Sequence, residues 1–418
     1  MKAPFIWDPY SDQPYQLKDR AFKKQMRRRH LGSLIVTVLT ALIILPLSYI
    51  FMPFLRQRKI DSSHFFGMSV NLDKEPQRTP ELIEELGVKS LLIRLPLWEM
   101  DRLDEYVGFV RQFQGKKLII NVMQDREHIE DLTLFKQHIT AVFESLSPYA
   151  ATFQIGSTIN RAKWGFFSVN EYLKFYKTAY DVKNADYPNL RLIGPSVIDF
   201  EYHFTAHALF NLVSLRFDAL SALLYVDRRG APENTQMGLG LTRKINLLSS
   251  MAKLSPKTGS ELYLTETNWP LTGTAPYAPT SEHECIDEEE YADFMVRYYL
   301  LAFASQQVDA VFWHQLIAPG YGLIDNREGF RKRSAFSAFK TMYSHLLHAT
   351  FSALHIYQNR YTLECTTPRG RLHIIWSLKA HIIAFDSASE CFSRDNTVLN
   401  TTNCTIGSSP VYVYLEND

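Results

Sequence analysis

Three residues whose side chains could take part in a reaction lie at the ends of short apolar runs in this sequence. Arg94, Tyr225 and Glu266 each fall at, or directly after, the end of a different run. A carboxylate can act as a nucleophile or can exchange a proton, and a nearby guanidinium favours its ionised form. Arg94 and Glu266 could therefore do chemistry together if the fold brings them close, and an ordinary salt bridge between the two is the alternative.

Aromatic residues gather at similar places. Four of the six tryptophans, Trp98, Trp164, Trp269 and Trp313, lie at or just after the ends of such runs. Aromatic faces near a few polar groups suit a ring-shaped ligand with apolar C–H faces, such as a sugar. Any one of these tryptophans could instead serve packing, but four together favour a binding mouth. We therefore expect carbohydrate as the ligand.

The runs themselves predict the elements that position these residues. Between residues 62 and 348, eight strand-length apolar runs alternate with amphipathic stretches, and the runs are continuously apolar, as in buried parallel strands. Eight such units favour a closed (β/α)₈ TIM barrel over a doubly wound α/β sheet. The expected strands are 64–71, 89–95, 117–122, 151–156, 190–197, 218–226, 261–265 and 309–314, and the expected helices are 80–86, 101–113, 132–146, 169–182, 241–254, 288–304 and 334–346.

In such a barrel the loops after the strands share one face, so these residues would meet in one mouth. Their order resembles the clan A retaining glycoside hydrolases, which have an arginine on strand 2, an Asn-Glu-Pro-Asn turn after strand 4, a Thr-Glu pair on strand 7 and an aromatic residue on strand 8. The sequence is most similar to the branch with β-xylosidases and α-iduronidases, over most of residues 62–418. Segments 322–325, 332–336 and 409–413 look like that clan's sequence after strand 8 and the last strand of its β-sandwich appendage.

The resemblance implies a role for each matched residue. Retaining hydrolysis needs two carboxyl groups about 5–5.5 Å apart, a nucleophile and an acid/base. Glu266 stands at the nucleophile position, and Arg94 matches the arginine that supports it. Thr158 stands where the family has the acid/base glutamate, and Ser157 replaces an asparagine, so that only Asn160 of that turn matches. A threonine hydroxyl does not protonate a leaving group near neutral pH.

The missing acid leaves hydrolysis in doubt, because general acid catalysis typically contributes about 10²–10⁴-fold. Glu201, Asp227 or Asp125 could reach across the mouth as a substitute, since each follows an expected strand. The acidic run 282–290 instead fits a solvated loop and a helix N-terminus, where acids favour the helix dipole. The expected substrate contacts are Trp98, Asn160, Trp164, Glu201, Tyr225, Asp227, Trp269 and Trp313.

Residues 31–55 carry no charge and are mostly Leu, Ile, Val, Phe and Ala. About 20 apolar residues cross a bilayer as a helix, and membrane helices tolerate prolines such as Pro46 and Pro53. The stretch exceeds a signal-peptide core and lacks a small-x-small cleavage site, so we expect an uncleaved single-pass anchor. Basic residues are denser before it than after it. The positive-inside rule therefore predicts a cytoplasmic tail at 1–30 and a barrel on the far side, in the periplasm if the cell is bacterial.

The last segment, 350–418, predicts short strands separated by polar turns, with no helical period. Such an all-β appendage would pack on the barrel and stabilise it, and carbohydrate binding is the alternative role. Cys391 and Cys404 are close enough in sequence to form a disulfide in an oxidising compartment, with free thiols as an equal alternative.

Composition narrows the function classes further. A net charge of +1 and the lack of any finger, ribonucleoprotein or Walker motif argue against nucleic acid as a partner. No Cys or His pattern has metal-ligand spacing, so we expect neither metal nor cofactor. Three hypotheses remain: a cell-envelope glycosidase acting on a polysaccharide or glycolipid glycan, a catalytically silent glycan-binding scaffold in envelope polysaccharide assembly, and a glycan transferase that keeps the nucleophile.

Overall fold

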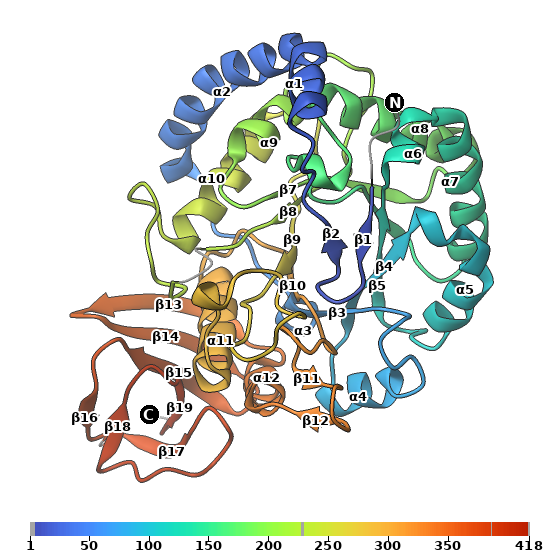
Figure 1. Ribbon diagram of the computed structural model, residues 1–418. Coiled ribbons are helices and arrows are strands. Elements are labelled where there is room, and N and C mark those ends of the chain that lie inside the picture. Colours follow the sequence, from blue (N-terminus) through green and yellow to red (C-terminus); the bar gives the residue numbers. More distant parts are fainter. Residues whose placement is uncertain (1–4, 227–229, 386, 417–418) are drawn as a thin grey trace.

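The computed structural model describes residues 5–226, 230–385 and 387–416, and its centre is a closed barrel of eight parallel strands (Figure 1). The chain runs once around the barrel, and the last strand pairs with the first. The expected barrel is therefore confirmed. Its strands are β3 (Phe66–Val70), β4 (Ser90–Pro96), β5 (Lys117–Met123), β6 (Thr152–Ile155), β7 (Arg191–Ile198), β8 (Ala219–Leu223), β9 (Leu262–Thr267) and β10 (Ala310–Trp313).

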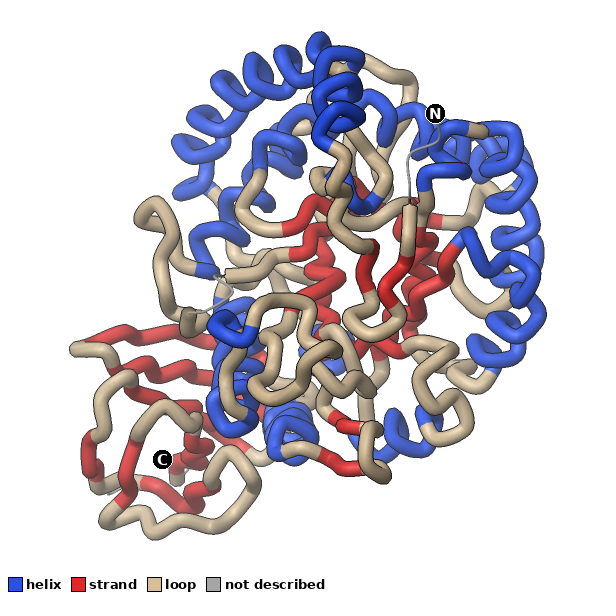
Figure 2. Tube along the Cα trace, viewed as in Figure 1, coloured by secondary structure: helices blue, strands red, loops and turns tan. Residues whose placement is uncertain are grey.

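Helices form a ring outside the strands (Figure 2). Every residue of β3, β4, β6, β8 and β10 is buried, which explains why these runs are apolar throughout. The ring contains α4 (Thr79–Leu86), α5 (Leu103–Arg111), α7 (Leu132–Leu146), α8 (Val169–Asp186), α10 (Leu241–Leu254), α11 (Glu288–Ala304) and α12 (Ser334–Leu346). Three short helices were not expected: α3 (Ser62–Phe65), α6 (Arg126–Glu130) and α9 (Tyr202–Leu209).

The C-terminal segment forms an antiparallel sheet in the order β13-β14-β15-β19-β17, with β16 and β18 paired separately. It is fastened to α11, because Arg394 binds both Asp293 and Glu289. The thiols of Cys391 and Cys404 are free in this structure and lie 3.9 Å apart. The strands are β13 (Thr350–Tyr357), β14 (Arg360–Thr367), β15 (Gly370–Ser377), β16 (His381–Ile383), β17 (Ala388–Phe392), β18 (Cys404–Ile406) and β19 (Val411–Leu415).

A long apolar helix lies outside the barrel. This helix, α2 (Leu31–Phe51), continues into the 3₁₀ turn η1 (Met52–Phe54), and together they are long and apolar enough to cross a membrane. In the structure α2 runs along α9 and α10 (Figure 1). Its inner face is polar: Thr37 Oγ1 lies 2.7 Å from His207 Nδ1, and Ser250 donates a 2.7 Å hydrogen bond to the carbonyl of Ser48.

The residues before α2 lie at the mouth of the barrel. Strands β1 (Trp7–Asp8) and β2 (Gln13–Pro14) pair as a hairpin, which Figure 1 shows over the barrel, and α1 (Arg20–Arg29) leads from it to α2. Gln315, just after β10, donates a 2.8 Å hydrogen bond to Asp12. Residues of the predicted tail thus contact the barrel in this structure, whereas a tail on the other side of a bilayer would lie about 30 Å of hydrocarbon away.

Candidate functional site

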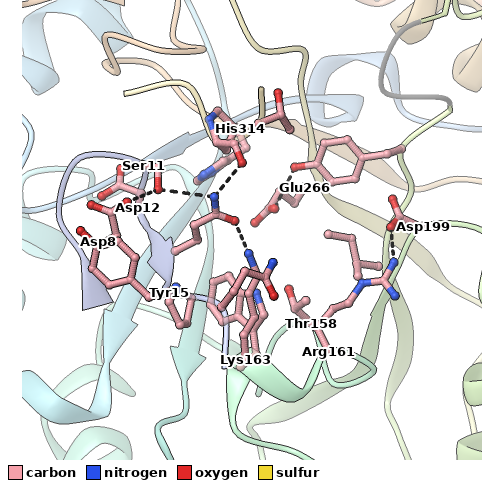
Figure 3. Close-up of a pocket in the computed structure, with 18 of the residues that line it drawn as sticks. Asp8, Ser11, Asp12, Tyr15, Thr158, Arg161, Lys163, Asp199, Glu266 and His314 are labelled. Carbon is pink, nitrogen blue, oxygen red and sulfur yellow. Dashed lines mark hydrogen bonds and ion pairs between the residues drawn. The ribbon is translucent and has the colours of Figure 1, made fainter. Parts of the chain in front are cut away.

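A cavity of about 350 Å³ lies where the barrel strands end (Figure 3). This volume is within the range of typical small-molecule sites, about 300–1,000 Å³. Its barrel lining comes from the ends of six strands and the loops that follow them. The lining residues from the barrel include Arg94, Thr158, Arg161, Lys163, Trp164, Asp199, Tyr225, Glu266 and His314.

Glu266 is the carboxylate that β9 brings into this cavity. The phenol of Tyr225, which follows β8, donates a 2.9 Å hydrogen bond to Glu266 Oε1. Burial raises the pKa of Glu266 above its ordinary value, although the charge of Arg94 and the bond from Tyr225 act to lower it. The cation therefore supports the ionised carboxylate, as expected, but does not outweigh the effect of burial.

Arg94 reaches the cavity from β4 and is buried. Its Nε lies 3.1 Å from Met123 Sδ, and its Nη1 lies 3.4 Å from His314 Nε2. Burial and the charge of Arg94 hold the pKa of His314 well below its usual range, so this imidazole is neutral. Among the described residues no ion pair within 4.0 Å joins Arg94 to Glu266. The guanidinium therefore acts on the carboxylate through its electrostatic field and not through a direct contact.

The turn after β6 holds Thr158 where the sequence resemblance expects the acid/base. Thr158 is buried, lines the cavity and has a φ of 53°. A β-branched residue rarely adopts this left-handed conformation, which costs on the order of 1–3 kcal/mol. The hydroxyl of Ser157 lies 3.5 Å from that of Thr158. The turn thus brings the hydroxyl group of Thr158, and no carboxyl group of its own, to the cavity.

Asn160 and Glu201 connect two loops instead of facing the cavity. The Asn160 amide donates to the Ile198 carbonyl at 3.0 Å and to Glu201 at 2.7 Å, and it accepts a 3.0 Å bond from the Ile198 amide. Glu201 also forms an ion pair with Arg161. These bonds join the loop after β6 to the end of β7, so Glu201 is already committed, and neither side chain lines the cavity beside Glu266.

The other proposed substitutes for the acid differ in position. Asp125 caps α6 by accepting a 2.9 Å hydrogen bond from the His128 amide, and it does not line the cavity. Asp227 lies outside the described residues. Asp199, which sequence reasoning missed, does line the cavity and pairs with Arg161. In the described part of the chain, no group of three or more His, Cys, Asp or Glu residues could hold a metal ion.

The four tryptophans separate into two pairs. Trp98 and Trp164 lie at the mouth, where the ring of Trp7 from the hairpin packs 5.0 Å and 5.8 Å from theirs. Trp269 and Trp313 are buried, stack 5.8 Å apart and pack among aromatic residues of α11. The expected contact of Trp269 and Trp313 with a ligand is thus not supported, because both rings face the core behind the strands.

The hairpin supplies the remaining wall, and sequence reasoning missed it entirely. Asp12 accepts hydrogen bonds from Gln315 and Tyr321, at 2.8 Å and 2.9 Å, and lies 3.5 Å from Lys74. Figure 3 shows Asp8, Asp12 and Tyr15 on one side of the cavity and Thr158, Arg161 and Asp199 on the other. Aromatic residues and an Asp-Pro turn at positions 5–10, unusual for a basic tail, are the signal that could have revealed a folded segment.

No family model matches this sequence, and no curated protein does. Solved structures do match. A family 39 glycoside hydrolase from Bacteroides cellulosilyticus has a TM-score of 0.63 at 14% identity, covering 85% of this chain and 82% of that one. A family 30 endoxylanase from Clostridium papyrosolvens has a TM-score of 0.58 at 13% identity, covering 86% of this chain and 97% of that one.

A family 39 β-xylosidase from Caulobacter crescentus is similar to the same extent. Its TM-score is 0.57 at 12% identity, and the match covers 87% of this chain and 98% of that one. At such identities the likeness concerns the fold. The chain has the fold of the clan A glycoside hydrolases, barrel and appendage together, as the resemblance in its sequence predicts.

Proposed function

We propose that this chain is a membrane-held barrel that binds a cell-envelope polysaccharide or glycolipid glycan and hydrolyses it poorly. One contrast carries the proposal: the end of β9 presents Glu266, bonded by Tyr225, whereas the turn after β6 presents Thr158. The first could attack a sugar, and the second cannot protonate the oxygen that departs.

The chemistry left to such a site is limited to one half of a retaining mechanism. The Glu266 carboxylate would attack the anomeric carbon, form a glycosyl ester, and expel the leaving oxygen with its bonding electron pair. Without a proton donor only a stable anion departs readily, so ordinary glycosides would be bound far more often than cleaved. Glu201, Asp125 and Asp199 offer no replacement, because their carboxylates are occupied in loop, helix and ion-pair contacts.

The experiment measures turnover of a panel of dinitrophenyl glycosides, whose leaving group needs no acid. We expect slow release of dinitrophenol that Glu266→Gln abolishes. Glu328→Gln is the matched control, because Glu328 is exposed and does not line the cavity. Rapid hydrolysis of unactivated glycosides by the unaltered chain would contradict the proposal.

A catalytically silent scaffold is the second candidate. The observation that favours it is the contact of Trp7 with Trp98 and Trp164, because these rings would otherwise stack on a sugar. Oligosaccharide binding with no turnover of any aryl glycoside, unaffected by Glu266→Gln, would favour this candidate over residual chemistry.

Membrane attachment is proposed through α2. The flanking charges favour a span with the tail on one side and the barrel on the other, whereas the bonds of Asp12 to Gln315 and Tyr321 favour one side for both. We give the contacts more weight and propose that α2 lies along the barrel with its apolar face in the bilayer. Single cysteines are introduced at exposed Gln16 and at exposed Glu328, and each is treated with an impermeant maleimide from the same side of the membrane. Labelling at both positions, or at neither, is expected if the tail and the barrel share one side. Labelling at only one position indicates a helix that crosses the membrane.

A further inference from the structure

A second hollow, a groove of about 600 Å³, lies between the N-terminal helices and the loop after β6. One wall is α1, and the other is formed by the barrel loops and the first turns of α2. The groove is lined by Arg20, Lys23, Lys24, Arg27, Leu34, Ile159, Asn160, Ala162, Phe166, Phe167, Ser168 and Phe204. Nothing in the proposed glycan chemistry uses it.

The α1 wall is a row of four cations. Arg20, Lys23, Lys24 and Arg27 follow an i, i+3, i+4, i+7 spacing, which places them on one face of the helix. None of these four side chains has an ion pair or a hydrogen bond to another described residue, and no carboxylate of the described chain lines the groove. The groove thus concentrates positive charge that the protein itself leaves uncompensated.

The opposite wall is apolar. Ile159, Phe166, Phe167 and Phe204 provide it from the barrel side, and Leu34 extends it to α2. From there the outer face of α2 and η1 continues the apolar surface, and its exposed side chains, 50–71% accessible, are Leu31, Ile35, Val38, Leu39, Leu42, Ile43, Leu47, Ile50 and Phe54. A small soluble anion would use only the basic wall, whereas a phosphate that carries hydrocarbon chains would use both.

The groove is held in shape by contacts of its own. The rings of Phe22 and Phe167 pack 5.7 Å apart, and His30 Nδ1 lies 3.0 Å from the Ser168 hydroxyl. The bond between Thr37 and His207 continues this attachment along α2. The cations therefore stand on a docked helix and not on a loose tail.

The groove also adjoins the catalytic cavity, since Lys23 and Ala162 line both. We propose that the groove binds a phosphate-bearing lipid, and that the glycan recognised in the cavity is attached to such a lipid. The lipid phosphate lies against Arg20, Lys24 and Arg27, its chains follow Leu34 onto α2, and its sugar extends past Ala162 toward Glu266. The assignment of the glycan rests on the proposed function, whereas the lipid site stands independently.

The test uses the full chain in a neutral detergent and native mass spectrometry, with dioleoyl phosphatidic acid as the probe. The groove variant is Lys24→Gln with Arg27→Gln. The matched control is Arg28→Gln with Arg29→Gln, which removes the same charge from the same helix outside the groove lining. We expect the groove variant to bind phosphatidic acid about tenfold or more weakly, from about 1 kcal/mol per basic residue, and the control to change it by less than about twofold.

Three outcomes overturn the lipid site: equal losses in both variants, equal affinity for neutral dioleoyl phosphatidylcholine, or displacement of the lipid by equimolar inorganic phosphate. The first would indicate general charge attraction, and the last a simple anion site. Binding of soluble oligosaccharides to the unaltered chain separates the two proposals. Oligosaccharide binding without selective lipid binding defeats only this inference, whereas selective lipid binding without oligosaccharide binding defeats the proposed glycan function.

Discussion

The loops after β6 and β9 both reach the cavity, but they are stabilised in different ways. Glu266 of β9 is bonded to Tyr225, and both residues line the cavity. The turn after β6 is instead stabilised by bonds to the end of β7 and the loop that follows it, from Asn160 to Ile198 and from Arg161 to Asp199 and Glu201. The comparison teaches that the turn after β6 keeps its backbone without a carboxylate of its own at the cavity, because other side chains hold it.

The largest expected effect comes from restoring the carboxylate. Thr158→Glu should speed hydrolysis of an unactivated glycoside by about 10²–10⁴-fold over Thr158→Gln, because general acid catalysis typically contributes this much. Glutamine matches the size of glutamate and the backbone strain at φ 53° but carries no acidic proton. The measurement is the rate of reducing-sugar release. Equal rates for the two variants would show that the site lacks more than a proton donor at position 158.

The second effect concerns the hairpin, whose Trp7 packs on Trp98 after β4 and on Trp164 in the loop after β6. Asp12→Asn removes a buried charge that accepts two hydrogen bonds and lies near Lys74, and such charged bonds each contribute about 1.5–3 kcal/mol. The open hairpin should become more populated, and oligosaccharide affinity should rise about tenfold. Calorimetry measures this, with exposed Asp101→Asn as the control. A weaker affinity would mean that the hairpin is part of the binding surface.

The third effect concerns Glu266 at the end of β9 and is a change in the pH dependence of activity. Tyr225→Phe removes a hydrogen bond that lowers the pKa of Glu266, so that pKa should rise further above its ordinary value. The nucleophile works only when ionised. The acid limb of kcat/KM for a dinitrophenyl glycoside should therefore move to higher pH, with activity lost earlier as pH falls. Tyr321→Phe, whose hydroxyl donates to Asp12 instead, should leave the limb in place.

The smallest effect concerns the turn after β6 and is a loss of folding stability. Asn160→Ala removes two donated hydrogen bonds and one accepted bond that join the loop to Ile198 and Glu201. We expect the free energy of unfolding to fall by about 1–3 kcal/mol, since the half-buried groups of Ile198 and Glu201 lose these hydrogen bonds. Denaturant titration measures this, with exposed Asn189→Ala as the control. An unchanged midpoint would contradict the view that these bonds hold the turn.

Much of the fold could be predicted because burial imposes a pattern on the local sequence. Helices α7, α10, α11 and α12 begin and end at the residues that apolar periodicity and capping residues such as Asp131 and Asp287 indicate. By contrast α9 was missed, because it is short and follows β7 almost directly. Strand ends likewise led to Arg94, Thr158, Tyr225 and Glu266, since parallel strands must end at a common face.

Two kinds of feature could not be predicted from the sequence: the direction in which a side chain at a strand end points, and contacts between residues that are far apart in the chain. Trp269 and Trp313 stand at strand ends like Trp98, but their rings turn outward to α11, a choice set by packing. The hairpin makes its contacts with residues such as Gln315, far along the chain, and no local pattern records them. The same holds for the polar face of α2, because the bonds from Thr37 to His207 and from Ser250 to Ser48 join residues far apart in the sequence.

The bond between Asp12 and Gln315 joins residues 303 positions apart, and this separation sets an order of events during synthesis. At roughly 5–20 residues per second, about 15–60 s pass between the emergence of the two partners from a ribosome. During that interval Trp7 and its neighbours have no barrel to bind. A chain that stops before β10 lacks Gln315 and Tyr321, so it cannot form the two hydrogen bonds that hold Asp12 at the mouth of the barrel.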